Sequence, residues 1–212
     1  MKTCVIYIHG KGGSAKEAEH YNSLFPDCDV LGFGYRTSTP WETGAEIHGE
    51  LERLSKIYGN IILVCNSIGA FFTMSSGIGN PDNPLHSKIS KAFFISPIVN
   101  MEKLICDMMM WAGVTEKELE EKSTIETDFG ETLSWEYLSY VRKHPIRWDI
   151  PTKILYGSMD NLVYMETMKN FVENQKAELT VMENGDHWFH TEQQMKFLDS
   201  WIAHAQSLPE VQ

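Results

Sequence analysis

The sequence predicts a three-layer α/β fold, in which an open and mostly parallel β-sheet has helices on both faces and is interrupted by a helical insertion. Two observations lead to this fold class. Short, β-branched apolar runs alternate with stretches of helical periodicity along most of the chain, and such alternation implies right-handed crossovers between parallel strands. Residues 61–64 are four consecutive large apolar residues, which is typical of a strand buried on both faces.

Six segments are expected to form the strands of this sheet. Each is short, largely apolar and bounded by turn-forming residues, as buried strands usually are. The expected strands are residues 4–8, 29–33, 60–65, 91–96, 153–156 and 178–182.

Helices are expected between these strands, and two of them begin at recognisable caps. Ser14 precedes Glu17 by three residues, and Thr39 precedes Glu42 by three, so both pairs fit the capping box. Pro40 then occupies the first helical position, where proline is favoured. Apolar residues at helical spacing support the assignments. The helical patterns cover residues 14–24, 39–58, 67–77, 164–172 and 195–202.

Residues 98–149 break the alternation, because helical patterns are all that we find there. An insertion of roughly 50 residues is longer than an ordinary crossover. We therefore expect a core of residues 1–97 and 150–212, with residues 98–149 as a helical cap or lid. Methionine clusters adapt to irregular apolar ligands, so the cap side chains are either pocket residues or the inner face of a cap helix. The candidates for a substrate pocket are Met108, Met109 and Trp111.

Composition excludes several classes of function. Lys and Arg total 18 and Asp and Glu total 29, a net charge of −11, so nucleic acid is not an expected partner. No apolar run reaches the roughly 18 residues of a membrane span, and the start of the chain does not resemble a signal peptide. Four cysteines without C-x-x-C spacing predict free thiols and no zinc site. We expect a cytoplasmic protein without metal or cofactor; its oligomeric state is unknown.

The most informative motif is CNSIG at residues 65–69. An apolar strand precedes Ser67 and a helical pattern follows it, as in the G-x-S-x-G nucleophile elbow. Its tight turn needs small neighbours, and Cys65, which replaces the first glycine, is still small. The turn would expose the hydroxyl at a helix N-terminus, which favours an oxyanion. A serine that simply caps a helix is the alternative, and Cys65 itself is a weaker candidate for the nucleophile.

Two later strands are followed by residues that could assist a nucleophile. Asp160 comes just after residues 153–156, and His187 comes just after residues 178–182. The carboxyl ends of strands in an open α/β sheet line one crevice, so we expect both side chains to converge on Ser67. Their chain order is Ser, Asp, His, as this architecture requires. Taken singly, Asp160 also suits a helix N-cap, and His187 suits a turn.

The first strand leads directly into HGKGG at residues 9–13. A glycine loop at this place can direct a backbone N–H at an oxyanion. A plain turn is the alternative, since the phosphate-loop spacings are absent. Other titratable residues are weaker candidates. His187 and His190 have the spacing of a metal-binding pair, but no third ligand is evident, and His9 suits a structural role. Asp186 is adjacent to His187 but would point away from it in an extended loop, so it is a poor candidate for the orienting acid.

Together these motifs resemble the α/β-hydrolase fold superfamily, specifically its compact lipase, esterase and serine-peptidase-like members. The resemblance covers nearly the whole chain except the insertion. It departs from the family at Cys65 and in lacking the two N-terminal strands of larger members. The matching motifs are HGKGG at 9–13, CNSIG at 65–69, YGSMDNLV at 156–163 and GDHWFH at 185–190.

This resemblance implies a serine hydrolase with a catalytic triad and an oxyanion hole. Ser67 would be the nucleophile, His187 the general base and acid, and Asp160 the residue that orients His187. The backbone N–H groups of Lys11 and Ile68 would bind the oxyanion. The expected substrate is a carboxylic ester with a small to medium apolar acyl group. A thioesterase, a peptidase or amidase acting on a small substrate, and a non-catalytic ligand-binding relative remain open.

Overall fold

The computed structural model describes residues 2–207 and confirms the α/β architecture. Within these residues the main sheet has six parallel strands in the order β2-β1-β3-β4-β7-β8. Every expected strand is present, with ends that differ from the prediction by no more than two residues. The strands are β1 Thr3–Ile8, β2 Asp29–Phe33, β3 Asn60–Asn66, β4 Ile89–Ile95, β7 Thr152–Gly157 and β8 Ala177–Met182.

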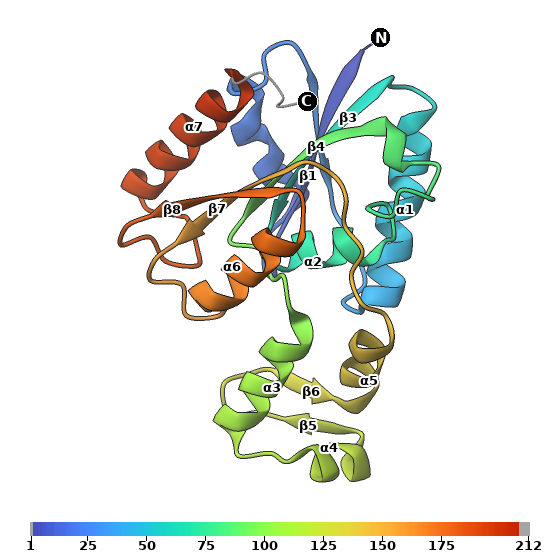
Figure 1. The fold of residues 1–212 in the computed structure, drawn as a ribbon, viewed down its shortest axis with the longest axis vertical. Coiled ribbons are helices and arrows are strands. Elements are labelled where there is room, and N and C mark those ends of the chain that lie inside the picture. The colour runs from blue at the N-terminus through green and yellow to red at the C-terminus, as the bar shows by residue number, and fades with distance from the viewer. Residues whose placement is uncertain (1, 208–212) are drawn as a thin grey trace. The chain divides into compact units, whose positions relative to one another are not determined.

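Helices connect these strands and cover the sheet, with α7 on one side and α1 on the other (Figure 1). The 3-10 helix η1 and α7 share a core cluster with strand side chains such as Tyr7 and Phe93, whereas α1 and α2 pack against each other. Over the part of the chain described, no helix is both long and apolar enough to cross a membrane. The helices of this unit are η1 Ala15–Ser23, α1 Pro40–Ser55, α2 Ile68–Ser75, η2 His86–Lys88, α6 Met165–Asn174 and α7 Glu192–Ser207.

The direction in which strands are added reverses at β1. From β1 the chain moves outward to β2 and then returns to β3 on the other side of β1. The connections after β1 and β3 therefore leave in opposite directions, and ligands of open α/β sheets bind at such a point. The glycine loop at residues 9–13 follows β1, and Ser67 follows β3. The topology thus places both motifs at the same edge of the sheet.

The insertion forms a compact unit of its own, Asn100–Ile146. The expectation that it contains helical patterns only was wrong, because β5 and β6 pair as an antiparallel hairpin. Three-residue strands are too short to reveal a period of two, and the turn between them includes Gly130 at φ +82°. Arg142 of α5 pairs with Glu102 of α3 and Glu116 of α4. The elements are α3 Met101–Ala112, α4 Glu116–Lys122, β5 Thr124–Glu126, β6 Thr132–Ser134 and α5 Trp135–Lys143.

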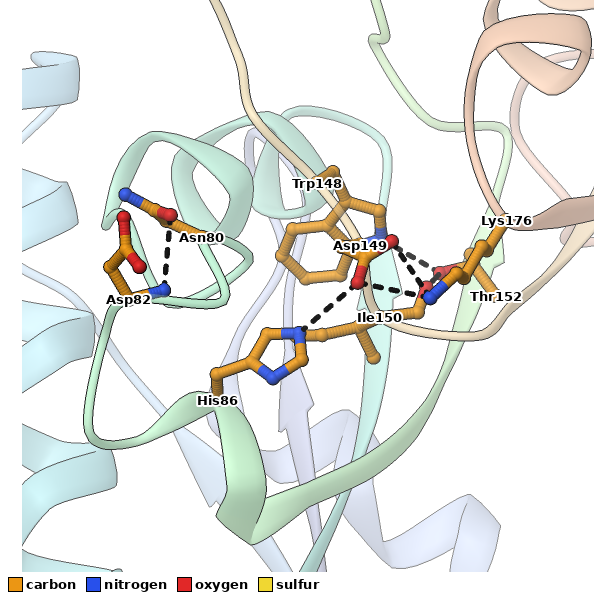
Figure 2. A network of polar contacts seen from close by, with 8 residues as sticks. All are labelled: Asn80, Asp82, His86, Trp148, Asp149, Ile150, Thr152 and Lys176. Carbon is orange, nitrogen blue, oxygen red and sulfur yellow. Dashed lines mark hydrogen bonds and ion pairs between the residues drawn. The ribbon is translucent and has the colours of Figure 1, made fainter.

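Polar contacts fasten the chain where it re-enters the main sheet, at the amino end of β7 (Figure 2). Trp148, which is 3% exposed, donates its indole N–H to Thr152 Oγ1 at 2.7 Å. Asp149 pairs with Lys176 at 2.9 Å, and its carboxylate also lies 4.0 Å from the ring of His86. These contacts hold the start of β7, whose opposite end leads into the loop that carries Asp160.

Candidate active site

The turn after β3 has a strained backbone, as the predicted nucleophile elbow requires. Ser67 adopts φ 50° and ψ −120° between the last residue of β3 and the first residue of α2. A residue with a Cβ rarely adopts this conformation, which costs about 1–3 kcal/mol. Neighbouring backbone stabilises the turn, because the Ser67 N–H donates to the Ile95 carbonyl at 2.9 Å and the Ser67 carbonyl accepts from Ile98 at 3.2 Å. The serine is therefore fixed relative to both β3 and β4.

Close packing explains which small residues the turn needs. A Cβ at Gly69 would lie 2.4 Å from the His9 carbonyl oxygen and 2.6 Å from that of Ile8, so only glycine fits there. Cys65 is different, since its side chain is fully buried with Sγ 3.5 Å from Thr73 Oγ1 of α2. This packing against α2 explains how a cysteine can occupy the position where the motif usually has glycine.

Three side chains from separate loops meet at the carboxyl edge of the sheet. The hydroxyl of Ser67 lies 2.7 Å from Nε2 of His187, and Nδ1 of the same ring lies 2.7 Å from Oδ2 of Asp160. The residues come from the loops after β3, β8 and β7 and are separated by up to 120 positions in the sequence. The three residues expected to converge therefore do so, in a continuous chain of hydrogen bonds.

Asp160 is held so that one of its oxygens faces the imidazole. Its side chain is 0% exposed, and Oδ1 accepts the backbone N–H groups of Leu162 at 2.8 Å and Val163 at 2.9 Å. Oδ2 remains for His187, whose side chain is 13% exposed. A carboxylate accepts hydrogen bonds, so Nδ1 of His187 carries the ring proton and donates a hydrogen bond to Asp160. Nε2 is then the basic nitrogen, and it faces the Ser67 hydroxyl.

The loops that carry Asp160 and His187 are also joined directly. The N–H of Ser158 donates to the Met182 carbonyl at 3.0 Å, and the N–H of Met159 donates to the Gly185 carbonyl at 2.8 Å. These bonds continue the pairing of β7 with β8 beyond the strand ends. The separation between the carboxylate and the imidazole is therefore set by backbone structure.

The glycine loop after β1 passes close to the serine. Gly10 accepts the N–H of Gly13 at 3.1 Å, and Gly12 between them has φ +75°, a positive value that a type II turn requires at this position. A Cβ at Gly10 would lie 3.2 Å from the Cβ of Ser67. The turn therefore lies beside Ser67, and the role of the Lys11 and Ile68 N–H groups as oxyanion donors stays a prediction.

The weaker candidates lie outside this chain of hydrogen bonds. Asp186 has a buried Oδ1 without a hydrogen-bond partner, and the acid bonded to His187 is Asp160. The ring of His190 stacks on Trp188 with centroids 4.2 Å apart. His9 is 9% exposed and stacks on Tyr35 at 4.3 Å. Among residues 2–207, no group of three or more His, Cys, Asp or Glu side chains is arranged to hold a metal ion.

The pocket residues expected in the insertion all lie on α3. Met109 is 4% exposed, whereas Trp111 is 44% exposed and meets Phe129 edge-to-face with ring centroids 6.3 Å apart. Met108 is half-buried. Their role in binding a substrate stays a prediction.

A contact that was not expected from the sequence lies beneath the glycine loop. The Tyr7 hydroxyl donates to Glu17 Oε2 at 2.6 Å. The sequence predicts Tyr7 as a core residue, because it lies in an apolar strand, and Glu17 as part of a helix cap. Neither assignment predicts a contact between the two. The one available signal was a phenol hydroxyl in a fully buried strand, because such a group needs a partner.

Solved structures with the same architecture include several hydrolases. Mouse alpha/beta hydrolase domain-containing protein 10 is 18% identical, with a TM-score of 0.75 over 95% of this chain and 88% of that one. Est1E from Butyrivibrio proteoclasticus is 14% identical, with a TM-score of 0.72 over 97% and 86%. The Pyrococcus furiosus esterase Pf2001 is 20% identical, with a TM-score of 0.62 over 97% and 80%. No protein-family model and no curated protein matches the chain. This chain has the α/β-hydrolase fold.

Proposed function

We propose that this protein is a serine hydrolase that cleaves carboxylic esters with small to medium apolar acyl groups. The observation that carries the proposal is the bonded series Ser67–His187–Asp160, with 2.7 Å at each step. A hydroxyl, an imidazole and a buried carboxylate in this order are the groups that acyl transfer to serine requires. The strained turn at Ser67 supports the same proposal, because strain of this kind gathers at functional sites.

The reaction follows from the proton positions. Nε2 of His187 accepts the Ser67 proton while Oγ attacks the acyl carbonyl carbon, and the carbonyl oxygen becomes an oxyanion. The resulting imidazolium, stabilised by Asp160, returns its proton to the leaving alcohol as the carbon–oxygen bond breaks. Water then attacks the acyl-serine with His187 again as base, which releases the acid and restores the hydroxyl.

The proposed oxyanion donors are the backbone N–H groups of Lys11 and Ile68. Ile68 is the first residue of α2, where the helix dipole favours negative charge. Lys11 lies in the Gly10–Gly13 turn, which passes close to Ser67. Removing one donor of this kind typically costs about 3–4 kcal/mol of transition-state stabilisation.

Exposed apolar side chains beside the proposed triad support an apolar substrate. Met159 precedes Asp160 and is 65% exposed, and Trp188 follows His187 and is 69% exposed. We propose that these two side chains contact an apolar group of the substrate.

A fluorophosphonate probe and a substrate panel test this function. We expect the probe to label the protein at Ser67, as located by peptide mass spectrometry, and we expect turnover of 4-nitrophenyl esters with apolar acyl groups. A Ser200→Ala variant, in which an exposed serine of α7 is replaced, should label and react as the wild type does. Faster turnover of acyl thioesters or aminoacyl amides would instead identify a thioesterase or an amidase. If the protein showed no labelling and no turnover, the result would favour a ligand-binding relative.

The thiol beside the elbow is expected to be dispensable. Burial raises the pKa of Cys65 to about 12, so the nucleophilic thiolate is absent at neutral pH. We expect Cys65→Ala to keep kcat/KM within about threefold of wild type, because the substitution leaves the triad intact, while packing loss lowers stability by about 1 kcal/mol. Steady-state kinetics and thermal unfolding measure the two effects. Loss of activity in a folded Cys65→Ala protein would make the thiol the better candidate nucleophile.

A further inference from the structure

A polar network lies beneath the glycine loop and ties the end of this loop to β1. Its centre is the hydroxyl of Tyr7, a β1 residue that is 1% exposed. The hydroxyl donates to Glu17 Oε2 at 2.6 Å, a contact between β1 and the first turn of η1. Burial, and secondarily the neighbouring Tyr21 and Glu17, raise the pKa of Tyr7, so its hydroxyl keeps the proton that it donates.

The second oxygen of Glu17 holds the far end of the loop. Oε1 accepts the backbone N–H of Ser14 at 2.7 Å, and a Cβ at Gly13 would lie 2.7 Å from the same oxygen. The carboxylate is therefore seated against the backbone of residues 13 and 14. Since β1 leads directly into residue 9, the turn Gly10–Gly13 is held at both ends.

The side of the turn next to the serine lies against Asn66. A Cβ at Gly10 would lie 3.5 Å from the Asn66 carbonyl oxygen and 3.8 Å from Cγ of its side chain. The glycine turn therefore lies between Ser14, which the Tyr7–Glu17 pair holds, and Asn66, the residue before the proposed nucleophile.

We propose that Tyr7 and Glu17 are positioning residues for the oxyanion hole, a role that rests on the proposed hydrolase function. They fix the turn that contains Lys11 to β1, and β1 pairs with β3, the strand that leads to Ser67 and Ile68. Oxyanion donors act only within about 2.7–3.1 Å of the developing charge, and a displacement of about 1 Å can reduce a rate by roughly 100-fold. Neither side chain touches the substrate in this proposal.

Two substitutions separate positioning from a purely structural role. Tyr7→Phe removes the hydroxyl and keeps the ring. Glu17→Gln keeps the shape of the side chain but has a single acceptor oxygen. It can therefore accept from Ser14 or from Tyr7, whereas the carboxylate accepts from both. Glu17 is exposed, so its variant is expected to fold even if a buried tyrosine substitution does not. Glu19→Gln, an equal charge change on the same 3-10 helix, is the matched control.

The readouts are kcat and KM for the best ester of the panel and the rate of fluorophosphonate labelling, measured well below the melting temperature. We expect Tyr7→Phe and Glu17→Gln to lower kcat and the labelling rate by about 10-fold to 100-fold, with KM within about twofold. Glu19→Gln should match the wild type. Folded variants with wild-type kcat and labelling, while the wild-type protein is active, would overturn the positioning role alone. A wild-type protein that neither labels nor turns over ester would overturn the hydrolase function and this role with it.

Discussion

Ser67→Ala is expected to reduce ester hydrolysis by about 10⁵-fold to 10⁶-fold, the loss typical of removing a serine nucleophile. Alanine keeps the Cβ, so the backbone strain at φ 50° is unchanged. The backbone bonds to Ile95 and Ile98 do not involve the side chain and also remain. What disappears is the hydroxyl and its hydrogen bond to His187, a contact worth about 1 kcal/mol to stability.

Steady-state kinetics and thermal unfolding of the purified Ser67→Ala protein check this result together. Ser200→Ala serves as the matched control, since it removes an equivalent hydroxyl from the exposed surface of α7. If the folded Ser67→Ala protein kept activity within tenfold of wild type, the bond between Ser67 and His187 would be structural. The nucleophile would then have to be sought elsewhere.

Asp160→Asn is expected to lower kcat by about 10⁴-fold, the loss that the wrong histidine tautomer causes in a Ser–His–Asp protease. The asparagine oxygen can take over the two backbone N–H bonds from Leu162 and Val163. Its amide NH₂ then faces Nδ1 of His187 and donates to it. The ring proton moves to Nε2, so the nitrogen beside Ser67 can no longer accept a proton.

Asp186→Asn is the matched control for this second prediction, because it makes the same change in the residue next to His187. Its carboxylate is not the group that bonds the imidazole, so we expect kcat within about threefold of wild type. Both rates are measured with the best substrate of the panel. A harmless Asp160→Asn combined with a severe loss in Asp186→Asn would show that the orienting acid had been assigned to the wrong residue.

The main sheet could be predicted because buried parallel strands leave a local signal. Runs such as residues 61–64 must be apolar on both faces, and each lies where a strand is found. The meeting of Ser67, Asp160 and His187 could also be predicted, since all carboxyl ends of parallel strands lie along one edge. Their distances could not, because these depend on contacts such as Met159 with Gly185.

The hairpin β5–β6 and the contact between Tyr7 and Glu17 escaped prediction for two physical reasons. Strands of three residues carry too few side chains to show alternation, so the loop around Gly130 gave no usable signal. Tyr7 sits in a run whose pattern specifies which face is buried but not which partner a hydroxyl finds. Glu17 is ten residues away, and the bend of the chain that brings the two together depends on the packing of η1 against the sheet.

The positive φ at Ser67 has a consequence for how this chain would evolve. Glycine adopts such a backbone without the steric penalty that any other residue suffers, so under the proposed function selection for thermal stability and selection for catalysis oppose each other at position 67. In a duplicated copy that is no longer selected for catalysis, we expect glycine to replace Ser67 soon after the duplication. A lineage that keeps serine at position 67 would thereby indicate continued selection for catalysis.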